Sequence, residues 1–82
     1  MKNVTKRDGS VVAFDRQKIV TAIEKAMDDT PAGVDEELAE QIATAIQDMD
    51  KDASVEEIQD MVEDNLMSSD RKDVARSYII YR

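Results

Sequence analysis

Apolar side chains recur at helical spacing in four stretches of this chain. They return every three or four positions over residues 16–28, 35–49 and 54–68, and again in a stretch that follows residue 70. This period places them on one face of a helix, so the pattern predicts four helices that share a core. The expected core-facing residues are Ile19, Ala22, Ile23, Ala26, Met27, Leu38, Ile42, Ala45, Ile46, Met49, Val55, Ile58, Met61, Val62 and Leu66, and in the last helix Val74, Ala75, Tyr78, Ile79 and Tyr81 leave little purely polar surface.

Residues that favour helix N-termini precede three of these stretches. Asp15 is placed to cap the first helix with its carboxylate, and either Ser69 or Asp70 is placed to cap the last one. Ser54 is followed three residues later by Glu57, which is the spacing of a capping box. These signals set the expected helix starts independently of the apolar pattern.

Two short runs, at 4–7 and 11–14, have the composition of β-strands and flank the turn dipeptide Asp8-Gly9. If the turn has only these two residues, Lys6 lies opposite Val11 and shares a face with Val4. The polar link at 50–53 is long enough to add an edge strand. Since a lone hairpin cannot bury one face by itself, we expect a small α+β fold, a four-helix cluster capped by a β-hairpin or a three-stranded sheet.

The length and composition limit the kinds of chemistry available. The 82 residues suit one domain, expected over 1–82, and they contain neither cysteine nor histidine. Disulfides, thiolate nucleophiles and imidazole metal ligands or general bases are therefore excluded. No apolar leader and no run of eighteen apolar residues is found, so we expect a cytoplasmic protein without a membrane partner.

The charge is divided unevenly along the chain, whose net charge is −8. Residues 1–26 hold six Lys/Arg against three Asp/Glu, residues 27–70 hold one against fifteen, and residues 71–82 hold four against one. If the fold brings the two ends together, Lys6, Arg7, Lys18 and Arg82 form a small cationic pocket in an anionic protein. Such a pocket attracts a compact polyanion such as a nucleoside triphosphate, whereas the acidic surface repels DNA.

Ordinary structural explanations exist for the same residues. A Lys-Arg pair before Asp-Gly is most often a solvated strand end, and Tyr78 and Tyr81 are most often core residues with a hydroxyl near water. The acidic run at 48–52 lacks the glycine and the final glutamate of a calcium-binding loop, so no tightly bound metal site is expected. With only two glycines and no glycine-rich phosphate loop, side chains and helix ends must hold any triphosphate.

In combination, five runs of the sequence closely resemble the ATP-cone family. The run Val4-Thr5-Lys6-Arg7-Asp8-Gly9, with 14–19 and 22–26, resembles the family's opening, and the runs 54–63 and 74–82 resemble its second half. The end of the chain is most similar to the cones of anaerobic-type ribonucleotide reductases. ATP-cones are regulatory domains in which ATP and dATP set reductase activity, and some belong to reductase repressors.

The resemblance implies a set of nucleotide-binding residues. The family's phosphate-binding strand bases correspond to Lys6 and Arg7, its first-helix lysine to Lys18, and its base- or ribose-reading polar residue to Asp15. In the same comparison Val4 lines the adenine pocket, and Arg82 stands in for a final basic residue. Some members have a glutamate where this chain has Val12 and a histidine near where it has Gln59.

These inferences together favour a non-enzymatic sensor of adenine nucleotides. ATP or dATP is the expected effector, with Mg²⁺ as a candidate companion ion. The expected partner is the catalytic domain of a ribonucleotide reductase, in cis or in trans, and self-association is also considered. Two alternatives stay open, namely a protein–protein interaction module of the same fold that has lost nucleotide binding, and part of a transcriptional regulator of reductase genes.

Overall fold

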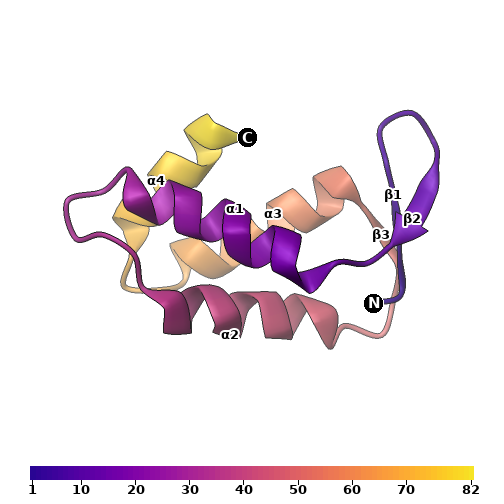
Figure 1. The fold of residues 1–82 in the computed structure, drawn as a ribbon, viewed down its shortest axis with the longest axis horizontal. Helices are drawn as coiled ribbons and strands as arrows, with labels where there is room; N and C mark the ends of the chain where they lie inside the picture. Colours follow the sequence, from indigo (N-terminus) through magenta and orange to yellow (C-terminus); the bar gives the residue numbers. More distant parts are fainter.

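The computed structural model describes residues 1–82 as four helices and a small sheet (Figure 1). This confirms the expected α+β class, with the three-stranded sheet rather than a hairpin alone. The elements in chain order are β1 (Asn3–Thr5), β2 (Val11–Ala13), α1 (Arg16–Asp28), α2 (Glu36–Gln47), β3 (Ala53–Ser54), α3 (Val55–Met67) and α4 (Lys72–Tyr81).

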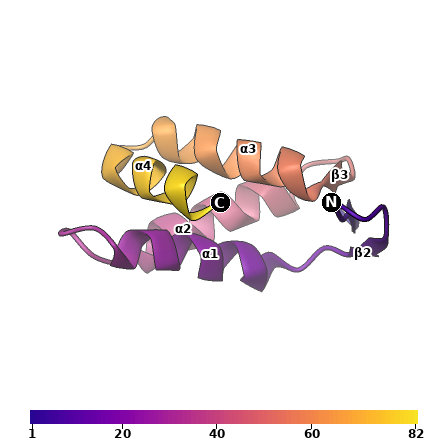
Figure 2. The same ribbon diagram turned by 90° about the horizontal axis from the view of Figure 1, so that it is seen from above.

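The helices form a cluster with the sheet at one end and the α1–α2 loop at the other (Figure 1). Helix α1 packs against α2 and α4, while α3 packs against α2 and α4, so each helix has two helical neighbours. Seen from above, α3 and α4 lie along one side and α1 along the other (Figure 2). Helix α1 follows β2 in the chain, and α3 follows β3. The first turns of these two helices therefore lie at the sheet end of the cluster.

Strand β1 is the middle strand of the sheet, in the order β2-β1-β3. It pairs antiparallel with β2 and parallel with β3, which brings Val4 beside Ala53. The Asp52 carboxylate fixes this second pairing by accepting bonds from the backbone N–H groups of Lys2 and Asn3, both at 3.0 Å. These bonds lower the pKa of Asp52 below its usual value, and the bond from the Asn3 N–H has the largest effect.

The register of the hairpin differs from the one expected for a two-residue turn. Thr5, rather than Lys6, lies opposite Val11, and Val4 lies opposite Val12. Because side chains alternate between the two faces of a sheet, Val12 now shares a face with Val4 and Lys6. The predicted register was therefore wrong by one residue.

The reason for this shift is a three-residue loop. The Lys6 N–H donates to the Ser10 carbonyl at 2.8 Å, and the Gly9 N–H donates to the Lys6 carbonyl at 3.0 Å. Gly9 takes a φ of +88°, the left-handed conformation with which such a loop ends. The Asp8 carboxylate accepts bonds from the Ser10 N–H and hydroxyl, at 2.9 and 2.6 Å, and so stabilises the wider loop.

Most of the predicted helix starts are confirmed. The Asp15 carboxylate caps α1 by accepting from the Gln17 N–H at 3.1 Å. Ser54 and Glu57 form the reciprocal capping box of α3, with both bonds at 3.1 Å. The predicted cap of α4 was wrong.

Helix α4 begins after Arg71, which makes no side-chain cap. The Ser69 hydroxyl instead donates to the Leu66 carbonyl at 2.6 Å and accepts from the Arg71 N–H at 3.1 Å. The Ser69 hydroxyl thus stabilises the turn after α3, and it lies two residues before the N-cap position of α4, which Arg71 occupies.

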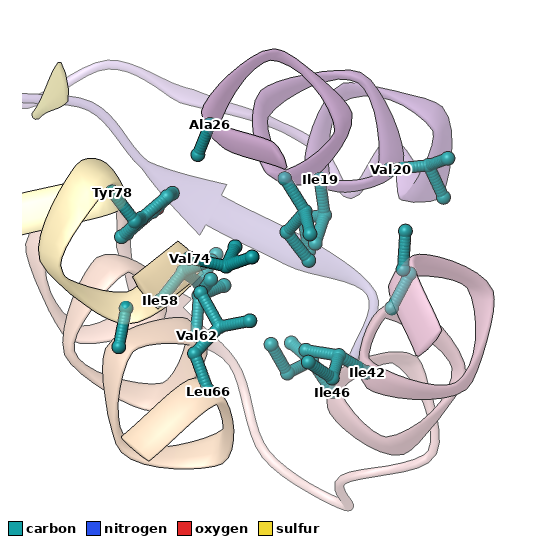
Figure 3. Close-up of a cluster of buried hydrophobic side chains, with 14 of the residues drawn as sticks. Ile19, Val20, Ala26, Ile42, Ile46, Ile58, Val62, Leu66, Val74 and Tyr78 are labelled. Atoms are coloured by element: carbon teal, nitrogen blue, oxygen red, sulfur yellow. The ribbon is translucent and has the colours of Figure 1, made fainter. Parts of the chain in front are cut away.

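The core lies between the four helices and is entirely apolar (Figure 3). The sets of buried residues in α2 and α4 differ from the predicted ones. In α2 the buried alanines are Ala39 and Ala43, whereas Ala45 is exposed, because the helix is rotated slightly from the expected stripe. In α4 only one face is covered, so Ile79 and Tyr81 remain about half exposed. None of the helices has the length and apolar character that would let it cross a membrane.

Candidate functional site

A pocket of about 340 Å³ is lined by residues of the sheet, the segment that leads from β2 into α1, and helices α1, α3 and α4. Its volume is within the range of small-molecule sites, and eleven of its fifteen lining residues are hydrophobic. The lining residues are Val4, Lys6, Val12, Ala13, Phe14, Asp15, Lys18, Ile19, Ala22, Val55, Ile58, Gln59, Val62, Tyr78 and Tyr81.

Four of the six predicted site residues meet in this pocket, namely Val4, Lys6, Asp15 and Lys18. The register of β1 and β2 places Val4 and Lys6 on the face of the sheet that also carries Val12. The Asp15 cap fixes where α1 begins, and Lys18 therefore lies in the first helical turn. Backbone N–H groups are unsatisfied in this turn and carry a partial positive charge, which favours an anion.

The other two predicted site residues, Arg7 and Arg82, do not line the pocket. Arg7 forms an exposed ion pair with Glu56 of α3, with Nε 3.0 Å from Oε1. Arg82 Nη1 lies 3.0 Å from Asp60 Oδ1 and 3.6 Å from Glu63 Oε1, both on α3. The hydrogen bond to Asp60 raises the pKa of Arg82 above its usual value. Carboxylates of one helix thus hold both arginines.

The basic residues inside the pocket are free of such partners. Lys6 and Lys18 are exposed, and every ion pair of the chain involves an arginine instead. Asp15 is the one carboxylate in the lining. Tyr78, which also lines the pocket, is buried, and this burial raises the pKa of its hydroxyl. The site therefore combines two unpaired positive charges with an apolar interior.

The sequence analysis did not assign Gln59 to the site. Its side chain joins the pocket lining from α3, and its Oε1 is buried without a hydrogen-bond partner. A signal was available, because Gln59 lies four residues after Val55 and three before Val62, on the same face of the helix. The two tyrosines were interpreted as core residues, and Tyr78 is one, yet both also contribute to this wall.

A larger hollow, of about 430 Å³, lies near the opposite end of the cluster, but its chemistry suits an anion poorly. Its lining includes the carboxylates of Asp35, Glu37 and Asp70 and only one base, Arg71. That guanidinium already binds Asp73 and other oxygens. The structure contains no group of three side chains that could hold a metal ion.

The chain matches the family model of the ATP cone domain over residues 2–82. It belongs to the ATP-cone family. This finding confirms the resemblance that the sequence runs indicated. ATP-cones are regulatory domains.

Relatives of this cone are found in several kinds of ribonucleotide reductase. A vitamin B12-dependent ribonucleoside-diphosphate reductase of Thermoplasma acidophilum is 49% identical over an alignment that covers 100% of this chain. An anaerobic ribonucleoside-triphosphate reductase of Haemophilus influenzae and a ribonucleoside-diphosphate reductase subunit alpha of Chlamydia trachomatis are both 37% identical over 96% of it. The chain spans only 9–12% of the length of these three proteins.

Proposed function

We propose that the pocket binds ATP or dATP, and that the domain reports this binding to a ribonucleotide reductase without itself catalysing a reaction. The observation that carries the proposal is the meeting of Lys6 and Lys18, two unpaired bases from different elements, at the rim of an apolar pocket in an ATP-cone. The net charge of −8 makes this local cluster the exception on an anionic chain.

The chemistry of the pocket suits the two halves of a nucleotide. The apolar walls accept the base and the sugar, while the lysines and the first turn of α1 bind the phosphates. No protein metal site accompanies them, so a Mg²⁺ ion would be held by the phosphates.

Arg7 and Arg82 have a conditional role in this proposal. Each is held by a carboxylate of α3 in the free domain, and each exchanges that partner for a phosphate oxygen when nucleotide binds. The Arg7–Glu56 pair is exposed on both sides, and such a pair is worth less than about 1 kcal/mol, so this exchange is energetically accessible.

The arrangement also gives a route by which binding would affect a neighbour. The pocket walls come from the sheet, α1, α3 and α4. A nucleotide that contacts Tyr78 and Tyr81 biases how α4 packs on α1 and α3. A reductase domain in cis or in trans would sense this change through α4.

A second candidate is an interaction module that keeps the fold but binds no nucleotide. It is favoured by the exposed apolar end of α4, where Ile80 is 86% exposed beside the half-exposed Ile79 and Tyr81. One measurement separates the two candidates.

Isothermal titration of the chain with ATP and dATP should show saturable heat at a ratio of 1:1 or higher. The expected affinity is micromolar, about −7 to −9 kcal/mol. The absence of heat and of NMR shift changes at millimolar nucleotide would reject the sensor and leave the interaction module.

A further inference from the structure

Strand β2 is an edge strand whose outer side has no partner. The sheet order is β2-β1-β3, and all three residues of β2 are exposed. In Figure 1 and Figure 2 this strand lies at the end of the molecule away from the helices. An uncovered edge presents backbone N–H and C=O groups in strand geometry, and such an edge is a template for another strand.

The hairpin bonds determine which backbone groups of β2 are unpaired. The Lys6 N–H donates to the Ser10 carbonyl at 2.8 Å, so these two residues form a hydrogen-bonded pair. Hydrogen-bonded and non-bonded pairs alternate along an antiparallel ladder. The next pair, of Thr5 with Val11, is therefore of the non-bonded kind, and so is the pair that contains Ala13. The N–H and C=O groups of Val11 and Ala13 thus point away from β1, and together they form the free edge of β2.

We propose that this free edge pairs with the same edge of a second copy of the chain. The two strands run antiparallel about a twofold axis at Val12, so Val11 of each copy lies opposite Ala13 of the other. Each of these two pairs exchanges two backbone hydrogen bonds, which satisfies every group of both free edges. The surface is therefore complementary to itself.

This register is favoured over its neighbours by the bonds at either end of β2. A shift of two residues places either Gly9 or Asp15 opposite the free edge. The Gly9 N–H already donates to the Lys6 carbonyl, and the Asp15 carbonyl already accepts from the Lys18 N–H. Only the register centred on Val12 pairs the free groups without competing for these bonds.

The side chains of this register also suit self-pairing. Residues 10–14 include neither a charged residue nor a proline, which are common means of protecting an edge strand. Val11 is 64% exposed and would pack against Ala13 of the second copy, while the two Val12 side chains would meet on the other face. No like charges oppose each other along these residues. Because the strands are short, we expect a weak dimer that becomes populated near millimolar concentration.

The chain lacks cysteine, so one introduced thiol reports the contact without background. Across the axis the two Val12 residues form a non-bonded pair with Cα atoms about 4.5 Å apart, and a disulfide spans about 4.4–6.8 Å. The two Val11 residues lie on a diagonal, roughly 9 Å apart, which is too far for a disulfide. With oxidised glutathione and without nucleotide, Val12→Cys should form a disulfide-linked dimer at least about tenfold faster than Val11→Cys.

Random collision predicts the opposite order, because Val11 is 64% exposed and Val12 only 39%. Equal rates, or a faster reaction of Val11→Cys, would overturn the proposal. In the Val12→Cys background, Val11→Pro removes an outward N–H, and Val11→Lys adds a charge to the edge; neither removes a bond between β1 and β2. Both should lower cross-linking to the rate of Val11→Cys, with circular dichroism as the check of folding. Undiminished cross-linking in the folded double variants would also contradict the pairing.

A dilution series on the unmodified chain locates the contact. Between about 0.05 and 1 mM, changes of amide NMR shifts should be confined to residues 10–14. Changes centred on another surface, or none, would contradict the proposal. These assays contain no nucleotide, so a failure of ATP to bind would overturn the proposed function and leave this result unaffected.

Discussion

Two groups of basic side chains, one at each end of the helix cluster, have opposite roles. At the loop end, the Arg71 guanidinium binds Asp73 at 3.1 and 3.2 Å, the Thr30 hydroxyl at 3.0 Å and the Gly33 carbonyl at 2.9 Å. At the sheet end, Lys6 and Lys18 are exposed and have no carboxylate partner. The first kind of base ties segments together, whereas the second is available to a ligand.

Arg7 and Arg82 stand between these two extremes. They belong to the sheet end and to the end of α4, and each is paired with α3. The Arg7–Glu56 pair is exposed on both sides, while the Arg82 side chain is 21% exposed. We expect the exposed pair to be the easier one for a phosphate to displace.

The largest effect that would test this comparison is the removal of Arg71. Arg71→Met keeps most of the side-chain volume but leaves Asp73, Thr30 and the Gly33 carbonyl without their shared donor. We expect the free energy of unfolding to fall by about 3 kcal/mol, since the guanidinium is largely buried and charge-assisted. Urea unfolding followed by circular dichroism measures this change.

The matched control for Arg71 is Arg76→Met, an exposed arginine of α4 that forms no ion pair. Its stability should change by less than about 0.5 kcal/mol. ATP affinity should be unchanged in both variants under conditions where each is folded. A weaker affinity in folded Arg71→Met would show that the loop end is not purely structural.

For Lys18 we expect the opposite of Arg71, namely a loss of ATP affinity without a loss of stability. Lys18→Ala should weaken ATP binding by about 1.5–3 kcal/mol, the contribution of a charge-assisted hydrogen bond. It should leave the thermal midpoint nearly unchanged, because the side chain is exposed and unpaired. Isothermal titration and a thermal melt on the same preparation measure the two quantities.

Lys25→Ala is the control for Lys18, since Lys25 is exposed on the same helix but lies outside the pocket. It removes the same charge and should change ATP affinity by less than about threefold. Equal losses in the two variants would mean that general charge, and not the pocket, attracts the nucleotide.

The smallest effect concerns the competing carboxylate Glu56. Glu56→Gln releases Arg7 from its ion pair, so ATP affinity should increase by about 0.5–1 kcal/mol if Arg7 then binds phosphate. Glu36→Gln removes an equal charge from the first turn of α2, where no ion pair is formed, and should have a smaller effect. If both variants bind ATP alike, Arg7 has no part in the site.

The sequence predicted those features that depend on local chemistry. The Asp15 cap and the Ser54–Glu57 box identified where α1 and α3 begin, because each is completed within three residues. The hairpin register failed because the Asp8 side chain stabilises a longer loop than the dipeptide alone suggests. The face of α2 was ambiguous because alanines lie on several sides of it.

The sequence predicted only part of the pocket, because some of its features depend on packing in three dimensions. Lys6 and Lys18 each follow from a local element, and their meeting follows from the packing of the sheet on the helices. The capture of Arg7 and Arg82 by α3 depends on which carboxylates lie within reach in three dimensions. No spacing in the sequence specifies that, since Arg82 and Asp60 are brought together by the packing of α4 on α3.

The parallel pairing of β1 with β3 also bears on how the protein is made. It pairs Val4 with Ala53, and α1 and α2 lie between these two strands in the sequence. The sheet is therefore complete only after the chain has passed through both helices. Contacts of such long sequence separation form late, because the chain entropy lost in closing the loop must be offset first. The pocket wall extends from Val4 to Tyr81, and a growing polypeptide therefore lacks a complete site until nearly all of this segment has left the ribosome.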